Sequence, residues 1–237
     1  MKQEFLKKNG TKALLLFFGG WGSAPKLFRD SVEGCGRDCL FCYDYKDCSF
    51  DFSLLEGYEE INLVAWSMGV WVAGQVFGGY KRCVENGKSV EHQEFERRIT
   101  SAVAIGGTSK PIDDLYGIPT AVFEATLDKM SPTVLYKFRR RMCGADLAVF
   151  ESRMPDRNID DLREELAAIR NMVSEGREST FRWSRAYVCG GDLIFPAANQ
   201  IRAWEKENVP VEMRDGAHYS ARLFDEICSS ETYFKTL

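Results

Sequence analysis

Ser67 lies in a local sequence that is typical of a nucleophile. It belongs to segment 64–69, Val-Ala-Trp-Ser-Met-Gly, which follows apolar, β-favouring residues and precedes small and apolar residues with helical character. A serine on a sharp strand-to-helix turn, with small residues two positions away on each side, is the pattern of a nucleophile elbow. Ala65 stands where glycine is more usual, but a methyl group is still small enough for such a turn. We therefore predict that Ser67 is a nucleophile.

His218 is the expected base for this serine. The sequence contains two histidines, His92 and His218. His218 follows the last expected strand, where the chain order serine, acid, histidine places the base. His92 lies in the charged stretch 91–94, which is typical of a solvated surface. We therefore predict that His218 accepts the proton of Ser67.

Asp192 is our prediction for the acid that orients the histidine. Such an acid holds the imidazole in one tautomer and stabilises its protonated form. Asp192 ends the strand that precedes the final helix and strand, which suits the chain order. Asp128 remains an alternative, because some hydrolases take the acid from one strand earlier. Asp215 is too close to His218 in sequence to be preferred.

Two backbone amides are expected to stabilise the negative charge that develops on a substrate oxygen. One is the amide of the residue after the nucleophile, here Met68. The other comes from a turn after an early strand, and the glycine-rich segment 18–22 occupies that place. We predict that Trp21 supplies this second amide.

A group of closely spaced cysteines raises a competing hypothesis. Cys35, Cys39 and Cys42 have the spacing that holds a cluster in radical enzymes built on S-adenosylmethionine, and cysteine clusters also bind zinc. The sequence lacks the repeated strand–helix units of a barrel. Two of these cysteines fall in an expected strand, where alternate side chains point to opposite faces. We predict neither a metal nor a cofactor, and expect the cysteines to pack as small hydrophobic residues.

The elements that must position these residues alternate between strand and helix. Strands are expected at 13–18, 38–45, 60–66, 100–105, 120–125, 186–189 and 209–213, and helices at 70–77 and 197–208. This alternation favours a largely parallel sheet with helices on both faces. Together with the serine elbow, it predicts the α/β-hydrolase fold.

A block of helices interrupts this alternation. Helices are expected near 131–143, 145–153 and 159–175, the last with apolar residues at helical spacing. We expect a core formed by residues 1–128 and 186–237 and a helical cap formed by residues 129–185. The apolar run 13–18 is too short for a membrane span and lacks a cleavage site, so a cytoplasmic protein with reduced cysteines is expected.

Charge is distributed unevenly between these parts. The chain has 237 residues and a net charge of -4, which argues against nucleic acid as a partner. The expected cap carries a net charge of +3 and the remainder -7. A basic cap on an acidic protein predicts an acidic partner or carrier. The candidate docking residues are Lys137, Arg139, Arg140, Arg141, Arg153 and Arg157.

Four motifs together resemble a known family. They are Phe-Phe-Gly-Gly-Trp-Gly at 17–22, Cys-Tyr-Asp-Tyr at 42–45, Ala-Trp-Ser-Met-Gly-Val-Trp at 65–71 and Gly-Ala-His-Tyr-Ser at 216–220. The chain resembles the BioG-type pimeloyl-[acyl-carrier protein] methyl ester esterases of biotin synthesis along essentially its full length. The resemblance implies hydrolysis of that methyl ester, with acyl carrier protein as the partner. Another serine hydrolase, such as an acyl thioesterase or short-chain carboxylesterase, and a non-catalytic binding protein of this fold remain alternatives.

Overall fold

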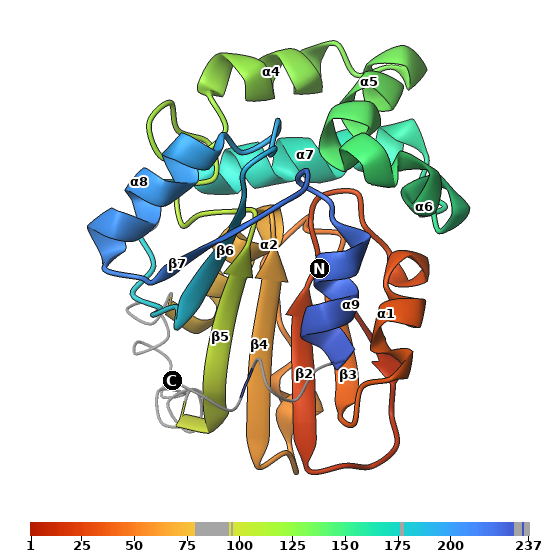
Figure 1. Cartoon of the computed structure of the whole chain (residues 1–237), viewed down its shortest axis with the longest axis vertical. Coiled ribbons are helices and arrows are strands. Elements are labelled where there is room, and N and C mark those ends of the chain that lie inside the picture. The colour runs from red at the N-terminus through yellow and green to blue at the C-terminus, as the bar shows by residue number, and fades with distance from the viewer. Residues whose placement is uncertain (79–94, 96, 176–177, 230–233, 235–237) are drawn as a thin grey trace.

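The computed structural model describes residues 1–78, 95, 97–175, 178–229 and 234 (Figure 1). Its centre is a seven-stranded sheet in the order β1-β3-β2-β4-β5-β6-β7. The strands are β1 (Lys2–Lys7), β2 (Ala13–Phe18), β3 (Asp38–Tyr43), β4 (Glu60–Trp66), β5 (Ile99–Ile105), β6 (Arg185–Cys189) and β7 (Val211–Arg214). β1 is antiparallel to β3, and the other neighbouring strands are parallel. This mostly parallel sheet confirms the predicted fold class.

The middle of the sheet is buried on both faces. All five residues from Leu14 to Phe18 are fully inaccessible to solvent. Continuous apolar strands of this kind are expected where helices cover both sides of a parallel sheet. The sheet is flanked by α1 (Arg29–Glu33), α2 (Met68–Gly78), α8 (Ala197–Glu207) and α9 (Ala221–Ser229). α1 and α9 contact each other, whereas α2 packs against β2 and β4.

Further helices connect β5 to β6. They are α4 (Thr120–Asp128), α5 (Pro132–Cys143), α6 (Leu147–Ser152) and α7 (Ile159–Ser174), with a 3₁₀ turn, η4 (Gly144–Asp146), between α5 and α6. Figure 1 shows these helices above the carboxyl ends of the strands. The three helices predicted in this region are therefore confirmed. α4 contacts α7, although it precedes the boundary proposed at residue 129, and the division into core and cap remains a proposal.

One expected strand is a helix. Segment 120–125 was predicted as a strand, but it forms the first part of α4. The amides of Val122 and Phe123 donate to the carbonyl oxygen of Pro119, which starts a helical turn. Phe123 and Leu127 are buried whereas Val122 is exposed, so burial follows a helical spacing.

Several elements were not predicted, among them β1, α1 and α9. β1 is an edge strand in which polar and apolar residues mix, and α9 follows closely after the segment that contains His218. β1 is defined by its pairing with β3, a long-range contact that leaves little trace in the local sequence.

Candidate active site

Ser67 lies on a strained turn between β4 and α2. Its φ angle is +59°, an unusual value for a residue other than glycine. The amide of Ser67 donates to the carbonyl oxygen of Ile105 over 2.9 Å, which ties the turn to the end of β5. A Cβ at Gly69 would collide with the carbonyl oxygens of Phe18 and Gly19. This close approach explains why the turn requires a very small residue at position 69.

His218 contacts both of its predicted partners. Its Nε2 lies 2.9 Å from Oγ of Ser67, and its Nδ1 lies 2.8 Å from Oδ2 of Asp192. All three side chains are buried. If Nδ1 carries the ring proton and donates a hydrogen bond to the Asp192 carboxylate, Nε2 is left with a lone pair that faces the serine hydroxyl.

Two aromatic residues fix the position of the imidazole. The ring of Phe195 lies nearly parallel to the ring of His218, with centroids 5.8 Å apart. The indole N–H of Trp66 donates to the carbonyl oxygen of His218 over 3.0 Å. These contacts hold both the ring and the backbone of His218, so the contact with Ser67 does not depend on one hydrogen bond alone.

The Asp192 carboxylate accepts hydrogen bonds on both oxygens. Its Oδ1 accepts from the amides of Ile194 and Phe195, each over 2.8 Å. Its Oδ2 accepts from Nε2 of Gln200 over 2.9 Å, in addition to its contact with His218. Asp192 is therefore oriented by the turn after β6 and by helix α8.

The rival candidates lie elsewhere. Asp128 is exposed at the end of α4, and Asp215 is exposed in the loop before His218. His92 lies outside the described residues. The structure brings together Ser67, Asp192 and His218, which follow one another along the chain in the order expected for this arrangement. Gln200 was missed, because nothing in the local sequence of α8 distinguishes a buried glutamine from a solvated one.

A mostly apolar cavity opens beside Ser67. Its walls come from the turn after β2, from β4, from the helices between β5 and β6, and from the segment after β6, and they include Ile118, Phe123, Phe138, Leu166, Leu193 and Ile194. Trp21 and Met68 also line this cavity. Met68 is the first residue of α2, so its amide has no acceptor inside that helix. Stabilisation of an oxyanion by these two residues remains a prediction.

The candidate docking residues occupy different environments. Lys137, Arg140 and Arg141 are exposed on α5, and Arg141 also lines the cavity beside Ser67. Arg139 is partly buried, and this burial lowers the pKa of its guanidinium group. Nε of Arg153 lies 3.0 Å from a carboxylate oxygen of Asp30.

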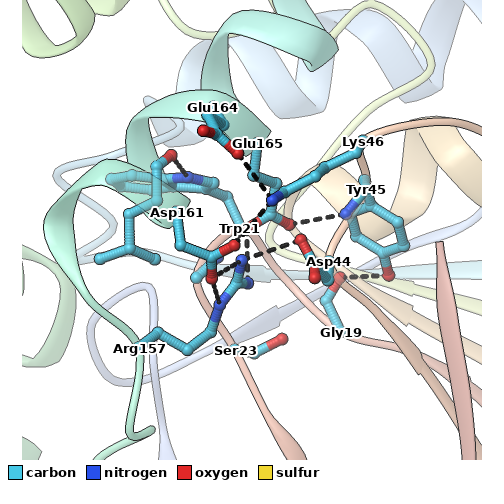
Figure 2. A network of polar contacts seen from close by, with 12 residues as sticks. Gly19, Trp21, Ser23, Asp44, Tyr45, Lys46, Arg157, Asp161, Glu164 and Glu165 are labelled. Atoms are coloured by element: carbon cyan, nitrogen blue, oxygen red, sulfur yellow. Dashed lines mark hydrogen bonds and ion pairs between the residues drawn. The ribbon is translucent and has the colours of Figure 1, made fainter.

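Arg157 does not fit the docking prediction. Its side chain is buried, and its guanidinium nitrogens lie within 2.9 Å of carboxylate oxygens of Asp44, Asp161 and Glu165 (Figure 2). A charge enclosed by three carboxylates is not available to a partner at the surface. We therefore withdraw Arg157 as a docking residue.

The cysteines that raised the metal hypothesis are buried. Cys39 and Cys42 lie in β3 and have no solvent exposure. Burial raises the pKa of both thiols. Among the described residues, no group of three His, Cys, Asp or Glu side chains is arranged to hold a metal ion. In the same part of the chain, no helix is long and apolar enough to cross a membrane.

A family model described as "Pimeloyl-ACP methyl esterase BioG" matches residues 1–232. The chain belongs to the BioG family. This confirms the resemblance inferred from the four sequence motifs. A solved BioG structure from Haemophilus influenzae is 33% identical to this BioG-family chain, covers 100% of both chains and superposes with a TM-score of 0.80.

Two further similarities bear on the activity and on the fold. A malonyl-[acyl-carrier protein] O-methyltransferase from Bacteroides fragilis is 41% identical over 91% of this chain, but the match spans 41% of that relative. An α/β hydrolase from a Medee basin deep-sea metagenome library is 14% identical, covers 100% of this chain and 94% of its own, and has a TM-score of 0.62. That second likeness concerns the fold alone and agrees with the predicted α/β-hydrolase architecture of this BioG-family chain.

Proposed function

We propose that this BioG-family chain is a serine esterase that hydrolyses the methyl ester of pimeloyl-[acyl-carrier protein] to methanol and pimeloyl-[acyl-carrier protein]. The observation that carries the proposal is the contact of His218 with both Ser67 and Asp192, beside a mostly apolar cavity that Ser67 and His218 line. This arrangement suits acyl transfer to a serine. Membership of the BioG family, whose model is described as a pimeloyl-ACP methyl esterase, supports this choice of ester.

Each proposed step uses an atom of this site. Ser67 Oγ attacks the ester carbonyl while Nε2 of His218 accepts its proton, and the oxyanion is stabilised by the amides of Met68 and Trp21. The carbon–oxygen bond to the methoxy group then breaks, and His218 passes the proton to departing methanol. His218 next deprotonates a water molecule that attacks the acyl-serine, which releases the carboxylate and restores Ser67.

The cavity suits an apolar acyl chain. Its lining is mostly apolar, which favours burial of a methylene chain and a neutral methyl ester. The product carboxylate is charged and costs free energy in apolar surroundings unless a cation pairs with it. The thioester that joins the acyl group to the carrier survives if only the distal end of the chain reaches Ser67.

Exposed cations support a carrier-bound substrate. Lys137, Arg140 and Arg141 lie on α5, and Arg141 lies where α5 meets the cavity. Acyl carrier protein is strongly acidic, so these residues would attract it and align its acyl chain with the cavity. Arg139 and Arg153 remain secondary candidates, since each is partly buried.

The name of the Bacteroides relative is compatible with this proposal. That relative is named for methylation of an acyl group on an acyl carrier protein, and most of it lies outside the match. A methyl ester on a carrier-bound acyl group is the bond that the proposed esterase would cleave. Methyl transfer by the present chain is therefore not needed to account for the similarity.

The experiment that tests the proposal is restoration of biotin synthesis. The chain is expressed in a bacterial strain that lacks its own pimeloyl methyl ester esterase, and growth is followed without biotin. We expect growth with the wild type and none with an equally abundant Ser67→Ala variant. A wild type that hydrolyses small esters but does not restore growth would support another serine hydrolase, such as a thioesterase or short-chain carboxylesterase.

A further inference from the structure

The first residue of the turn after β2 (residues 19–23) is fixed by contacts with Cys42 and Tyr45. The amide of Gly19 donates to the carbonyl oxygen of Cys42 over 2.9 Å. The hydroxyl of Tyr45 donates to the carbonyl oxygen of Gly19 over 2.7 Å, and the hydroxyl of Ser23 donates to that of Gly20 over 2.7 Å. These contacts determine how the chain leaves β2.

The later residues of this turn, Trp21 and Gly22, are held by α7. The indole N–H of Trp21 donates to the carbonyl oxygen of Leu162 over 2.9 Å. The amide of Gly22 donates to Oε2 of Glu165 over 3.2 Å. Figure 2 shows Glu165 and Trp21 in the same polar network. The residue that carries the predicted oxyanion amide, Trp21, is therefore anchored by a helix that lies outside the central sheet and its flanking helices.

Glu165 bridges two loops of the sheet. Its Oε1 accepts a hydrogen bond from the amide of Tyr45 over 3.0 Å, and its Oε2 accepts one from the amide of Gly22 in the 19–23 turn. A glutamine at this position would offer one oxygen and one NH₂ group, so one of the two amides would face a donor rather than an acceptor. The observed contacts therefore require a carboxylate.

The charge of Glu165 is costly in its position. Its side chain has no solvent exposure, and burial raises its pKa, although the nearby Arg157 opposes this effect. Arg157 lies 2.7 Å from Oε2 of Glu165 and is itself buried. Replacing a buried ion pair with apolar residues is often neutral or stabilising. A net gain in stability therefore does not account for this buried pair, which contacts the 19–23 turn through Glu165.

We propose that Glu165 is a positioning residue, which holds the 19–23 turn so that the Trp21 amide faces the oxyanion formed at Ser67. This inference rests on the proposed function, because it assumes that Ser67 forms a tetrahedral adduct. It follows from this proposal that the turnover rate depends on how α7 packs against the loops that follow β2 and β3. α7 belongs to the same inserted helices as α5, which carries the exposed cations.

The test measures the rate at which a fluorophosphonate labels Ser67. In this reaction Ser67 Oγ bonds to phosphorus, His218 accepts the serine proton, fluoride leaves, and the phosphoryl oxygen occupies the oxyanion site. We expect Glu165→Gln to lower the maximal labelling rate about 10- to 100-fold, because loss of one oxyanion donor has effects of this order or larger. The probe concentration that gives half of the maximal rate is expected to stay unchanged.

Asp38→Asn is the matched control. Asp38 is also buried and accepts hydrogen bonds from backbone amides, those of Asn9, Gly10 and Thr11. It begins β3, and therefore lies at the end of the sheet opposite to Ser67. We expect both variants to melt at lower temperature, but Asp38→Asn to label at the wild-type rate.

The outcomes separate the inference from the proposed function. A folded Glu165→Gln variant that labels at the wild-type rate overturns the inference alone. If the wild type is not labelled at Ser67, the result contradicts both the proposed function and the inference that rests on it. If Glu165→Gln does not fold, Glu165→Asp takes its place, since it keeps the carboxylate but is too short to reach the amides of both Tyr45 and Gly22. A slower maximal rate in Glu165→Asp supports the inference, and the wild-type rate contradicts it.

Discussion

The side-chain nitrogen of Gln200 lies 2.9 Å from Oδ2 of Asp192, the same oxygen that lies 2.8 Å from Nδ1 of His218. This nitrogen also donates to the carbonyl oxygen of Phe195 over 2.7 Å. Both neighbours are acceptors, so the orientation of the amide is determined. The other amide atom, Oε1, is buried and has no hydrogen-bond partner among the described residues. An orphaned acceptor costs stability, which points to a positioning role for Gln200.

Replacing Gln200 with leucine is expected to lower kcat about tenfold on a small ester, with little change in KM, because Asp192 loses a donor that fixes its carboxylate. Steady-state kinetics on purified protein measure this split. Asn199→Leu is the matched control, since Asn199 is the neighbouring buried amide on α8 and donates to the carbonyl oxygens of Asp114 and Gly117 instead. Equal losses of kcat in both variants would argue against a specific role for Gln200.

Replacing Asp192 with asparagine is expected to lower kcat roughly 1,000-fold or more, because the imidazole is then no longer held in the required tautomer. Asp128→Asn provides the comparison, since Asp128 was the alternative acid and is exposed at the end of α4. Its activity is expected to match the wild type. A large loss in Asp128→Asn with activity retained in Asp192→Asn would reverse the assignment.

Asp161 makes the stability of the protein depend on pH. Burial raises the pKa of Asp161, but its contacts with Lys46 and Arg157 outweigh this effect and lower the pKa below its ordinary value of 3.8. The ionised form is therefore favoured by folding, and its stabilising effect is present above pH 3.8 and lost as the pH falls through the lower folded-state value. Urea denaturation of wild type and Asp161→Asn across this range measures the difference. A stability difference that stays constant down to the lowest pH would contradict this prediction.

Reversing two charges on α5, with Lys137→Glu and Arg140→Glu together, is expected to raise KM for the carrier-bound ester about tenfold at low ionic strength. Activity on a small neutral ester is expected to persist, since these residues are exposed and do not line the cavity. Added salt should reduce the difference from the wild type. Lys12→Glu, at the amino end of β2, is the control. Similar losses on both substrates would count against docking of the carrier on α5.

The local sequence was sufficient to identify residues that lie on a distinctive turn or belong to a residue type that is rare in this chain. Ser67 was found because its elbow restricts the size of neighbouring residues, and His218 because it is one of two histidines in the right chain order. Gln200 and Glu165 were missed. Their roles arise from contacts with residues that come from other elements, and a glutamine or glutamate on a helix is usually solvated.

The same limit explains the wrong predictions. Arg157 was counted among the surface cations because its charge is visible in the sequence, whereas its burial against Asp44 depends on a long-range contact. Segment 120–125 was predicted as a strand from its local sequence. Its helix is instead started by the Pro119 carbonyl and stabilised by burial of Phe123. Tertiary packing outweighs β preference in such a segment.

The most direct test of the central claim is the mass of the carrier-bound product. Purified protein is mixed with pimeloyl-[acyl-carrier protein] methyl ester, and the intact carrier is measured by mass spectrometry. We predict a mass change equal to replacement of one methyl group by hydrogen, with the acyl chain still attached, and no change with Ser67→Ala. Release of the whole acyl chain from the carrier, or an unchanged rate in Ser67→Ala, would contradict the account.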